Sequence, residues 1–278
     1  MLTEQRYNIR ELLPYIDWTY FFHAWEVPAK SNEAQTLKEE AMQMMQTLEA
    51  DDRPIAKGRV GLFSAGSQGD DIVLATDDGQ TAAIPCLRQQ HPTDGGPNLC
   101  LADFVKPWGA QGGEDTVGVF ATMVDYDPDA QWHHDAYLRM MAQTLCDRLA
   151  EAAACRLHQE VRTTIWGYAK DEQLTVSEII SERQRGIRPA VGYPSLPDQS
   201  VNFLIDPLIG MTQMGITLTE NGAMRPHASV SGLMIAHPES RYFAVGQIDR
   251  QQVEDYAARR RIPTQRIMKF IKPTSITT

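Results

Sequence analysis

The chain has 278 residues, of which 42% are hydrophobic, so it can bury a large core. Its formal net charge of −10, with no dense stripe of Lys and Arg, argues against binding to nucleic-acid phosphates. No run of about 18 apolar residues and no basic-then-apolar leader pattern occurs, and the four cysteines are scattered without paired spacing. We therefore expect a cytoplasmic protein with reduced thiols that does not enter a membrane.

The first half of the chain changes from a helical to a strand-like pattern. Apolar residues at helical spacing predict an amphipathic helix over 31–48. Short apolar runs between Gly-, Ser- and Asp-rich turns then predict antiparallel strands. These strands are expected at 59–63, 71–75, 81–85, 98–105 and 116–123.

The second half begins with the longest helical pattern, over 129–166. A second helix is expected over 175–185, because Thr175 and Glu178 form a capping-box pattern and Gly186 suits a helix end. Asp249 and Pro263 are expected to begin and end a last helix. The remaining predictions are a helix at 206–214 and strands at 215–219, 228–236 and 242–248.

These elements predict the fold class and the domain organisation. No internal repeat, low-complexity segment or long linker divides the chain. We expect an α+β fold, a mostly antiparallel twisted sheet with a long central helix and flanking helices, forming a single domain over residues 1–278.

The segment Arg188-Pro189-Ala190-Val191-Gly192-Tyr193-Pro194 has the composition of a rigid ligand-binding loop. Each proline biases the residue before it, Arg188 or Tyr193, toward an extended backbone. Gly192 permits a positive φ or the close approach of a ligand. From these residues alone, an ordinary surface turn explains the segment equally well.

Two aromatic segments have a structural and a functional interpretation. Asp17 lies among aromatic residues at 15–25, where it can be a helix N-cap or a carboxylate that meets a cationic ligand group. Tyr242 and Phe243 lie in an expected strand, so their rings should face opposite sides and at most one should line a pocket. Taken alone, both segments favour the structural interpretation.

Motifs for several kinds of chemistry are missing. The chain has no GxGxxG, GxxxxGK[ST] or GxSxG motif, which argues against dinucleotide sites, phosphate loops and serine hydrolases. Adjacent His133 and His134 would point about 100° apart on a helix, so we expect no metal site there. His158 is expected at a helix surface or core edge. No nucleophile, base and orienting group can be assembled, and no catalytic residue is predicted.

Many segments, in order along nearly the whole chain, resemble the activation domain of cobalamin-dependent methionine synthase, the part that binds S-adenosylmethionine. They include YIDWTYFF at 15–22, GRVGLF at 58–63, CLADFV at 100–105, WGYA at 166–169, GIRPAVGYP at 186–194, ASVSG at 228–232 and YFAVGQIDRQQVEDYAARR at 242–260. The resemblance implies that Asp17 binds the ammonium of the ligand and Arg188 its carboxylate. It further implies ligand-site positions at Ala190, Tyr193, Tyr242, Phe243, Glu151 and Glu182.

The resemblance also implies a function that needs no catalytic group in this chain. Such a domain supports the reductive methylation of cob(II)alamin, with cobalamin on a partner protein or domain of methionine synthase and an electron from a flavodoxin-like reductant. The chain has no Asp-x-His-x-x-Gly cobalamin motif, so it is not a complete methionine synthase. A non-catalytic module that docks on a corrinoid protein or flavodoxin is the alternative. A self-sufficient methyltransferase is disfavoured because no acceptor-activating base is evident.

Overall fold

The computed structural model describes residues 2–49, 53–92, 95–111 and 113–271 and has the expected α+β fold. Its described residues form one six-stranded antiparallel sheet in the order β4-β3-β2-β5-β8, with β1 paired to β2, and one small two-stranded ribbon, β6-β7. The strands are β1 Leu2–Tyr7, β2 Ala56–Gln68, β3 Asp71–Ala75, β4 Thr81–Pro85, β5 Asp115–Val124, β6 Thr217–Leu218, β7 Met224–Arg225 and β8 Ser229–Ile235.

Strand β2 is the spine of the sheet. Its residues 56–65 pair with β5 along one side, while the other side pairs with β1 over 56–61 and with β3 over 65–68. Strand β8 pairs with the far side of β5 and ends the path of the sheet. An edge strand has unpaired backbone groups along one side, so β8 can accept a further segment of the chain.

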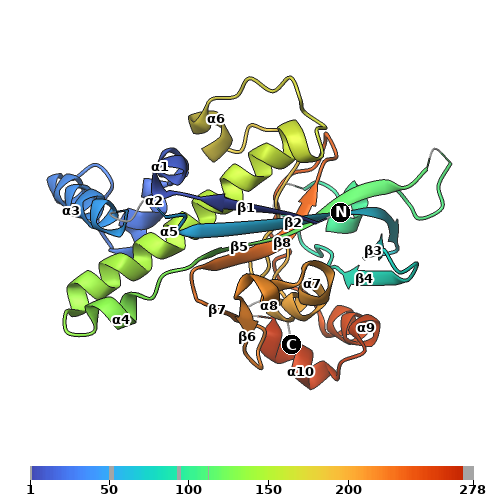
Figure 1. The fold of residues 1–278 in the computed structure, drawn as a ribbon. Coiled ribbons are helices and arrows are strands. Elements are labelled where there is room, and N and C mark those ends of the chain that lie inside the picture. The colour runs from blue at the N-terminus through green and yellow to red at the C-terminus, as the bar shows by residue number, and fades with distance from the viewer. Residues whose placement is uncertain (1, 50–52, 93–94, 112, 272–278) are drawn as a thin grey trace.

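Helices cover both faces of the sheet (Figure 1). The long helix α5 and the N-terminal helices lie against one face, and α7 and α8 lie against the other. The helices are α1 Ile9–Leu12, α2 Trp18–Ala24, α3 Asn32–Leu48, α4 Pro128–Trp132, α5 Ala136–Glu160, α6 Val176–Ile180, α7 Asn202–Ile209, α8 Met211–Met214, α9 Arg250–Arg260 and α10 Thr264–Phe270. Short 3-10 turns occupy Leu13–Tyr15, Leu101–Phe104 and Gln199–Val201, and a π-helical turn occupies Val161–Ile165.

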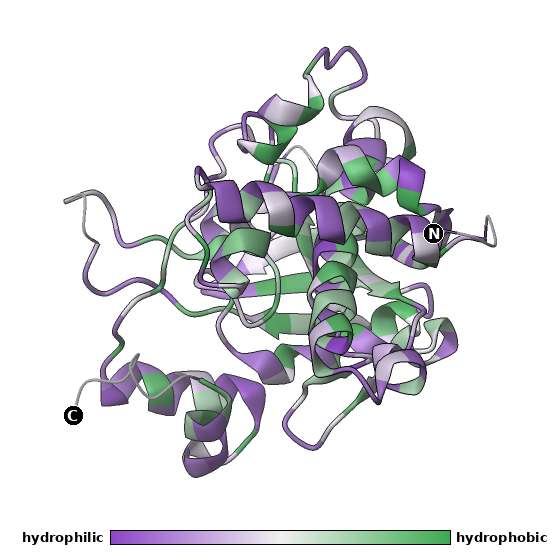
Figure 2. Cartoon of the chain, turned by 90° about the vertical axis from the view of Figure 1, so that its left-hand side faces the viewer, coloured by the Kyte–Doolittle hydropathy of each residue, from purple (hydrophilic) through white to green (hydrophobic). Residues whose placement is uncertain are grey.

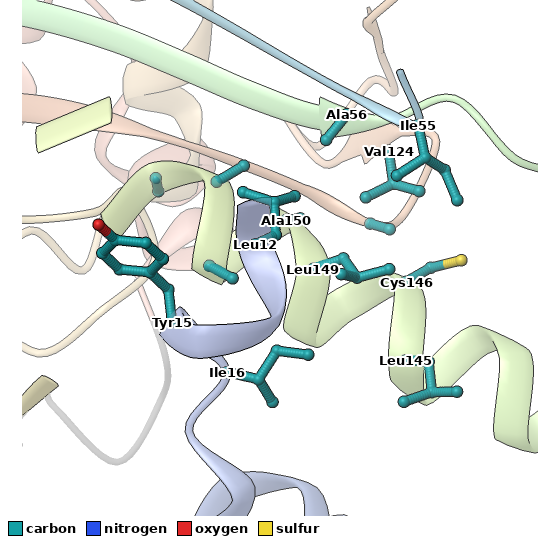
Figure 3. Packing of buried hydrophobic residues seen from close by; sticks show 14 of the residues in the cluster. Leu12, Tyr15, Ile16, Ile55, Ala56, Val124, Leu145, Cys146, Leu149 and Ala150 are labelled. Atoms are coloured by element: carbon teal, nitrogen blue, oxygen red, sulfur yellow. The ribbon is translucent and has the colours of Figure 1, made fainter. Parts of the chain in front are cut away.

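Helix α5 packs between the N-terminal segment and the sheet. Figure 3 shows its buried Leu145 and Leu149 with Leu12 and Ile16 of the N-terminal segment, and with Val124 at the end of β5. Small side chains along α5, such as Ala150 and Ala153, are fully buried and allow the helix to approach the sheet closely. Thr122 of β5 donates a hydrogen bond of 3.0 Å to the Ala150 carbonyl.

Strand β5 is buried on both faces. Phe120 and Val124 belong to the core beneath α5, whereas Val119 and Ala121 belong to the core beneath α7 and α8. This alternation follows from the two-residue period of a strand. Figure 2 shows the corresponding pattern, with apolar colour on the inner strands and much of the polar colour on the surrounding helices.

Several predicted elements have different ends from those expected. The helix at 31–48 and the strands at 71–75, 81–85, 116–123 and 228–236 are confirmed within one or two residues, and the strand at 59–63 belongs to the longer β2. The expected helix over 129–166 is interrupted, because Asp135 accepts a hydrogen bond from Leu138 N and begins α5 as a new helix. The expected helix over 206–214 is two helices, since Gly210 adopts a left-handed conformation between α7 and α8.

Other predicted elements are wrong. The expected strand at 98–105 contains a 3-10 turn, because the Asp103 carboxylate accepts a hydrogen bond from Cys100 N and closes a local turn. No strand forms at 242–248, and the helix expected over 175–185 ends at Ile180. Strand β1 and helices α1 and α10 were not predicted as elements, whereas the N-cap interpretation of Asp17 is confirmed by helix α2. Within the described ranges, none of the helices has both the length and the apolar character needed to cross a bilayer.

A buried ion pair fastens the segment after α5. The guanidinium of Arg162, whose side chain is 0% exposed, donates hydrogen bonds of 2.9 and 2.6 Å to the carboxylate of Glu172, which is 7% exposed. Removing one partner would leave the other charge buried and uncompensated. This pair therefore fixes the chain between α5 and α6.

We predict that Glu172→Ala lowers the free energy of unfolding by about 3–5 kcal/mol, measured by urea denaturation. The matched control is Glu254→Ala, which breaks an ion pair between side chains that are 85% and 52% exposed. That change should cost about 0.5 kcal/mol or less. Equal effects of the two substitutions would contradict a special role for the buried pair.

Candidate functional site

A cavity of about 530 Å³ lies between segments that are far apart in the sequence. Its walls come from the start of α2, from one face of α5, from the chain between α6 and residue 195, and from residues 242–244. All eight residues expected from the sequence to form a site line it. They are Asp17, Glu151, Glu182, Arg188, Ala190, Tyr193, Tyr242 and Phe243.

The loop that carries Arg188 is attached to the edge strand β8 by backbone hydrogen bonds. Ile187 N and Leu233 N donate to Ile235 O and Pro189 O, and Val191 N donates to Ser231 O, with lengths of 2.9, 3.0 and 2.9 Å. A Cβ at Gly232 would lie 2.1 Å from Pro189 O, so only glycine permits this approach. The sheet therefore fixes the direction in which Arg188 leaves the loop.

The side chain of Arg188 lines the cavity, and Glu151 is its one ion-pair partner among the described residues. Its side chain is 17% exposed, and its nearest acidic oxygen, on Glu151, is 3.7 Å away. No side-chain hydrogen bond from Arg188 occurs among the described residues, although its carbon lies 6.0 Å from the Phe120 ring centroid. Burial alone would lower the pKa of Arg188, but the acidic groups of Tyr242 and Glu151 outweigh it and raise that pKa. The cavity thus presents a permanent cation with free donors.

Glu151 joins two parts of the cavity. One carboxylate oxygen accepts a hydrogen bond from the Tyr193 hydroxyl, and the other faces Arg188. Burial, followed by the nearby Glu151, raises the pKa of Tyr193, so its phenol remains protonated and donates. Glu151 therefore orients both Arg188 and Tyr193 from a position on α5.

Asp17 is a helix N-cap, as the structural interpretation of its sequence context predicts, and it also lines the cavity. One carboxylate oxygen accepts a hydrogen bond of 2.9 Å from Thr19 N and caps α2. Among the described residues no partner is found for the other oxygen, and Asp17 lines the cavity. A capping carboxylate can thus also face a bound cation.

Both aromatic residues after the last sheet strand, Tyr242 and Phe243, line the cavity, and the ring of Phe243 also packs against the core at Phe104. The chain is irregular there and the alternation of a strand does not apply. The Arg188 backbone N–H donates a 2.9 Å hydrogen bond to the Tyr242 hydroxyl, and Val245 N donates to Pro194 O at 2.9 Å. These long-range bonds place Tyr242 and Phe243 beside the loop.

Glu182 follows the end of α6, in the left-handed region with a φ of 58°. Its carboxylate has no hydrogen bond or ion pair among the described residues. Burial raises the pKa of Glu182, and the nearby Arg188 partly offsets this. Ala190 is buried where the loop meets Gly232.

Several cavity residues were missed by sequence reasoning. Arg148, Cys155 and His158 were not expected at the site; together with the expected Glu151 they are spaced by three or four residues and line one side of α5. The sequence signal that could have identified them is this recurrence of polar residues on one side of an otherwise apolar helix. Tyr15 and the exposed Tyr20 add aromatic surface from the N-terminal wall.

His158 is a buried imidazole rather than the surface or core-edge residue expected. It is 2% exposed, and its Nε2 lies 3.2 Å from the Tyr168 hydroxyl. Burial, assisted by the charges of Arg162 and Arg188, lowers the pKa of His158 well below its ordinary value. The floor of the cavity therefore holds a neutral histidine.

We predict that this neutral state makes folding pH-dependent. The unfolded chain binds a proton at His158 as the pH falls through about 6.5, whereas the folded chain does not. Stability should then fall with decreasing pH, at up to about 1.4 kcal/mol per pH unit from this group. Urea denaturation of the unsubstituted protein and of His158→Gln between pH 7.5 and 5 measures it. An unchanged pH slope in the variant would refute this assignment.

Other parts of the described structure offer fewer of the residues expected to bind a ligand or a metal ion. A larger hollow of about 1140 Å³, lined by residues such as Lys57, Asp125 and Gln143, contains none of the eight expected residues. The part of the chain that the structure describes holds no group of three or more His, Cys, Asp or Glu side chains placed to bind a metal ion.

Two comparisons with known proteins agree with each other. The family model described as the activation domain of vitamin B12 dependent methionine synthase matches residues 8–261. Among solved structures, the chain is similar to the MetH reactivation domain bound to AdoHcy, with 39% sequence identity and a TM-score of 0.91. That similarity covers 100% of this chain and 91% of the other. The matched residues include all eight residues that were expected from the sequence and that line the cavity.

Proposed function

This chain belongs to the family of vitamin B12-dependent methionine synthase activation domains, and from that membership we propose that its cavity binds S-adenosylmethionine and presents the methyl group to cobalamin on a partner protein or domain. The domain then supports the reductive methylation of cob(II)alamin, as part of a methyltransferase system. Residues 1–278 act as a single domain, in the cytoplasm, where four free cysteines are expected.

The single observation that carries this proposal is the position of Arg188 at the cavity wall, where its nearest acidic oxygen, on Glu151, is 3.7 Å away. Its guanidinium is largely buried and makes no hydrogen bond to the described part of the protein, so it calls for an anion, and its planar donors match a carboxylate in a bidentate pair. The ligand carboxylate would become the main partner of Arg188. Glu151 would keep its bond to Tyr193.

The other end of the amino-acid part of the ligand is an ammonium group. The free oxygen of Asp17 is a suitable acceptor, and the aromatic surface of Tyr15 and Tyr20 also favours a cation. The cavity volume of about 530 Å³ lies within the range of roughly 300–1,000 Å³ typical of small-molecule sites. Size and charge therefore fit this zwitterionic ligand.

The residues of this chain bind and orient the methyl donor, and they supply no nucleophile. Cobalamin, when the partner presents it, supplies the cobalt that accepts the methyl group, and a flavodoxin-like reductant supplies the electron. The exposed Tyr20 and Tyr193 at the cavity are available to contact such a partner.

We predict that Arg188→Ala weakens S-adenosylmethionine binding by about 30-fold or more, because losing one member of a buried charge pair costs about 2 kcal/mol or more. Asp17→Asn should also weaken binding while preserving the helix cap, since asparagine is a good N-cap. Isothermal titration calorimetry measures both.

The control for this experiment is Arg250→Ala, which removes an exposed arginine outside the cavity and should leave the affinity unchanged. Failure of the unsubstituted protein to bind S-adenosylmethionine would contradict the proposal. Capture of a corrinoid protein or flavodoxin by a chain that binds no ligand would instead support a non-catalytic docking module.

A further inference from the structure

Two walls of the cavity, helix α5 and the loop that carries Arg188, must keep a fixed separation for a ligand to fit between them. Backbone pairing with β8 fixes the loop on the sheet. One contact that joins the loop to α5 is the bond from the Tyr193 hydroxyl to Glu151. A second contact runs through Tyr168, which is not among the described residues that line the cavity.

The Tyr168 hydroxyl lies between the two walls. It is 3.2 Å from Nε2 of His158, which lines the cavity on α5, and 3.4 Å from the carbonyl oxygen of Arg185, at the start of the loop. A Cβ at Gly186 would lie 2.6 Å from this hydroxyl oxygen and 2.7 Å from Ile235 O. Glycine therefore lets the loop begin in the narrow space between Tyr168 and β8.

Tyr168 is itself held in place by the turn that follows α5. Ala169 N donates a 2.9 Å hydrogen bond to Arg162 O. The Tyr168 ring packs edge-to-face on Trp166, with ring centroids 4.8 Å apart, and the guanidinium carbon of Arg185 lies 5.7 Å from its centroid. The position of the hydroxyl is thus set by its own segment and does not depend on the loop.

The two contacts of this hydroxyl also indicate where the protons lie. Burial raises the pKa of Tyr168, so the phenol keeps its single proton. A carbonyl oxygen only accepts, so Tyr168 must donate to Arg185 O for that contact to be a hydrogen bond. The phenol oxygen then accepts from Nε2–H of His158. If Tyr168 instead donated to Nε2, no proton would join it to Arg185 O.

We propose that Tyr168 is a positioning residue for the methyl donor. A hydrogen-bond relay from His158 through Tyr168 to Arg185 fixes the Arg188 loop relative to α5 and holds the neutral imidazole with its proton on Nε2. This inference rests on the proposed function. Tyr168 acts through the two walls, because a guanidinium that is already held in place binds a carboxylate at a smaller ordering cost.

The test combines ¹⁵N NMR of the histidine side chains with calorimetric titration of S-adenosylmethionine. In the unsubstituted protein, Nε2 of His158 should carry the proton, with its signal assigned by its loss in His158→Gln. Tyr168→Phe should move the Nε2–H proton resonance upfield and speed its exchange with water, because its acceptor is gone. The same substitution should weaken S-adenosylmethionine binding by about fivefold.

The chain contains a matched control at Tyr7. Its ring is buried, and its hydroxyl donates a 2.8 Å hydrogen bond to Glu160, two residues after His158 on α5. Tyr7 is not among the described residues that line the cavity. Tyr7→Phe therefore removes a buried phenol bond to the same end of the helix. It should leave the His158 signals unchanged and alter S-adenosylmethionine affinity by less than about twofold.

The outcomes separate this inference from the proposed function. If the unsubstituted protein does not bind S-adenosylmethionine, the proposed function is overturned, and with it the role of Tyr168 in binding. If it binds the ligand but Nδ1 of His158 carries the proton, the relay alone is overturned. If Tyr168→Phe and Tyr7→Phe weaken binding equally, the phenol contributes only to stability and the positioning role is wrong.

Discussion

The backbone pairing between strand β8 and the loop at 187–191 sets the geometry of the whole cavity. This pairing needs Gly232, because any side chain there would collide with Pro189 O. Once the loop lies on β8, the Arg188 N–H meets the Tyr242 hydroxyl and Pro194 O meets Val245 N. A contact at the edge of a sheet therefore brings the loop and the segment after β8 together.

Helix α5 supplies the second fixed surface of the cavity. Its apolar side is fastened in the core by residues such as Leu145 and Leu149, so the polar side that carries Glu151 and His158 cannot rotate away. The charges then follow from this arrangement. Arg188 is kept charged but without a hydrogen-bonded acceptor, and His158 is kept neutral beside it. Such a preorganised cation is suited to bind an anion with little rearrangement.

The sequence predicted those features whose causes are local. Alternating apolar runs marked most strands of the sheet, a capping pattern marked the start of α6, and the composition of the Arg188 loop indicated a rigid segment. The resemblance to a family named eight residues that the structure places around one cavity. One prediction failed because of a distant contact. Residues 242–248 look like a strand, yet Tyr242 bonds to a residue 54 positions away and the segment stays irregular. The break before α5 depended on which of several aspartates caps a helix, and the sequence alone did not decide it.

The central claim is that Arg188 and its neighbours form a binding site for the amino-acid end of S-adenosylmethionine. A crystal structure of this chain with S-adenosylmethionine bound tests it most directly. We expect the ligand in the cavity of about 530 Å³, with its carboxylate paired to the Arg188 guanidinium and its ammonium near Asp17. A ligand bound elsewhere, for example in the hollow beside Lys57 and Asp125, with Arg188 still facing only Glu151, would contradict the claim.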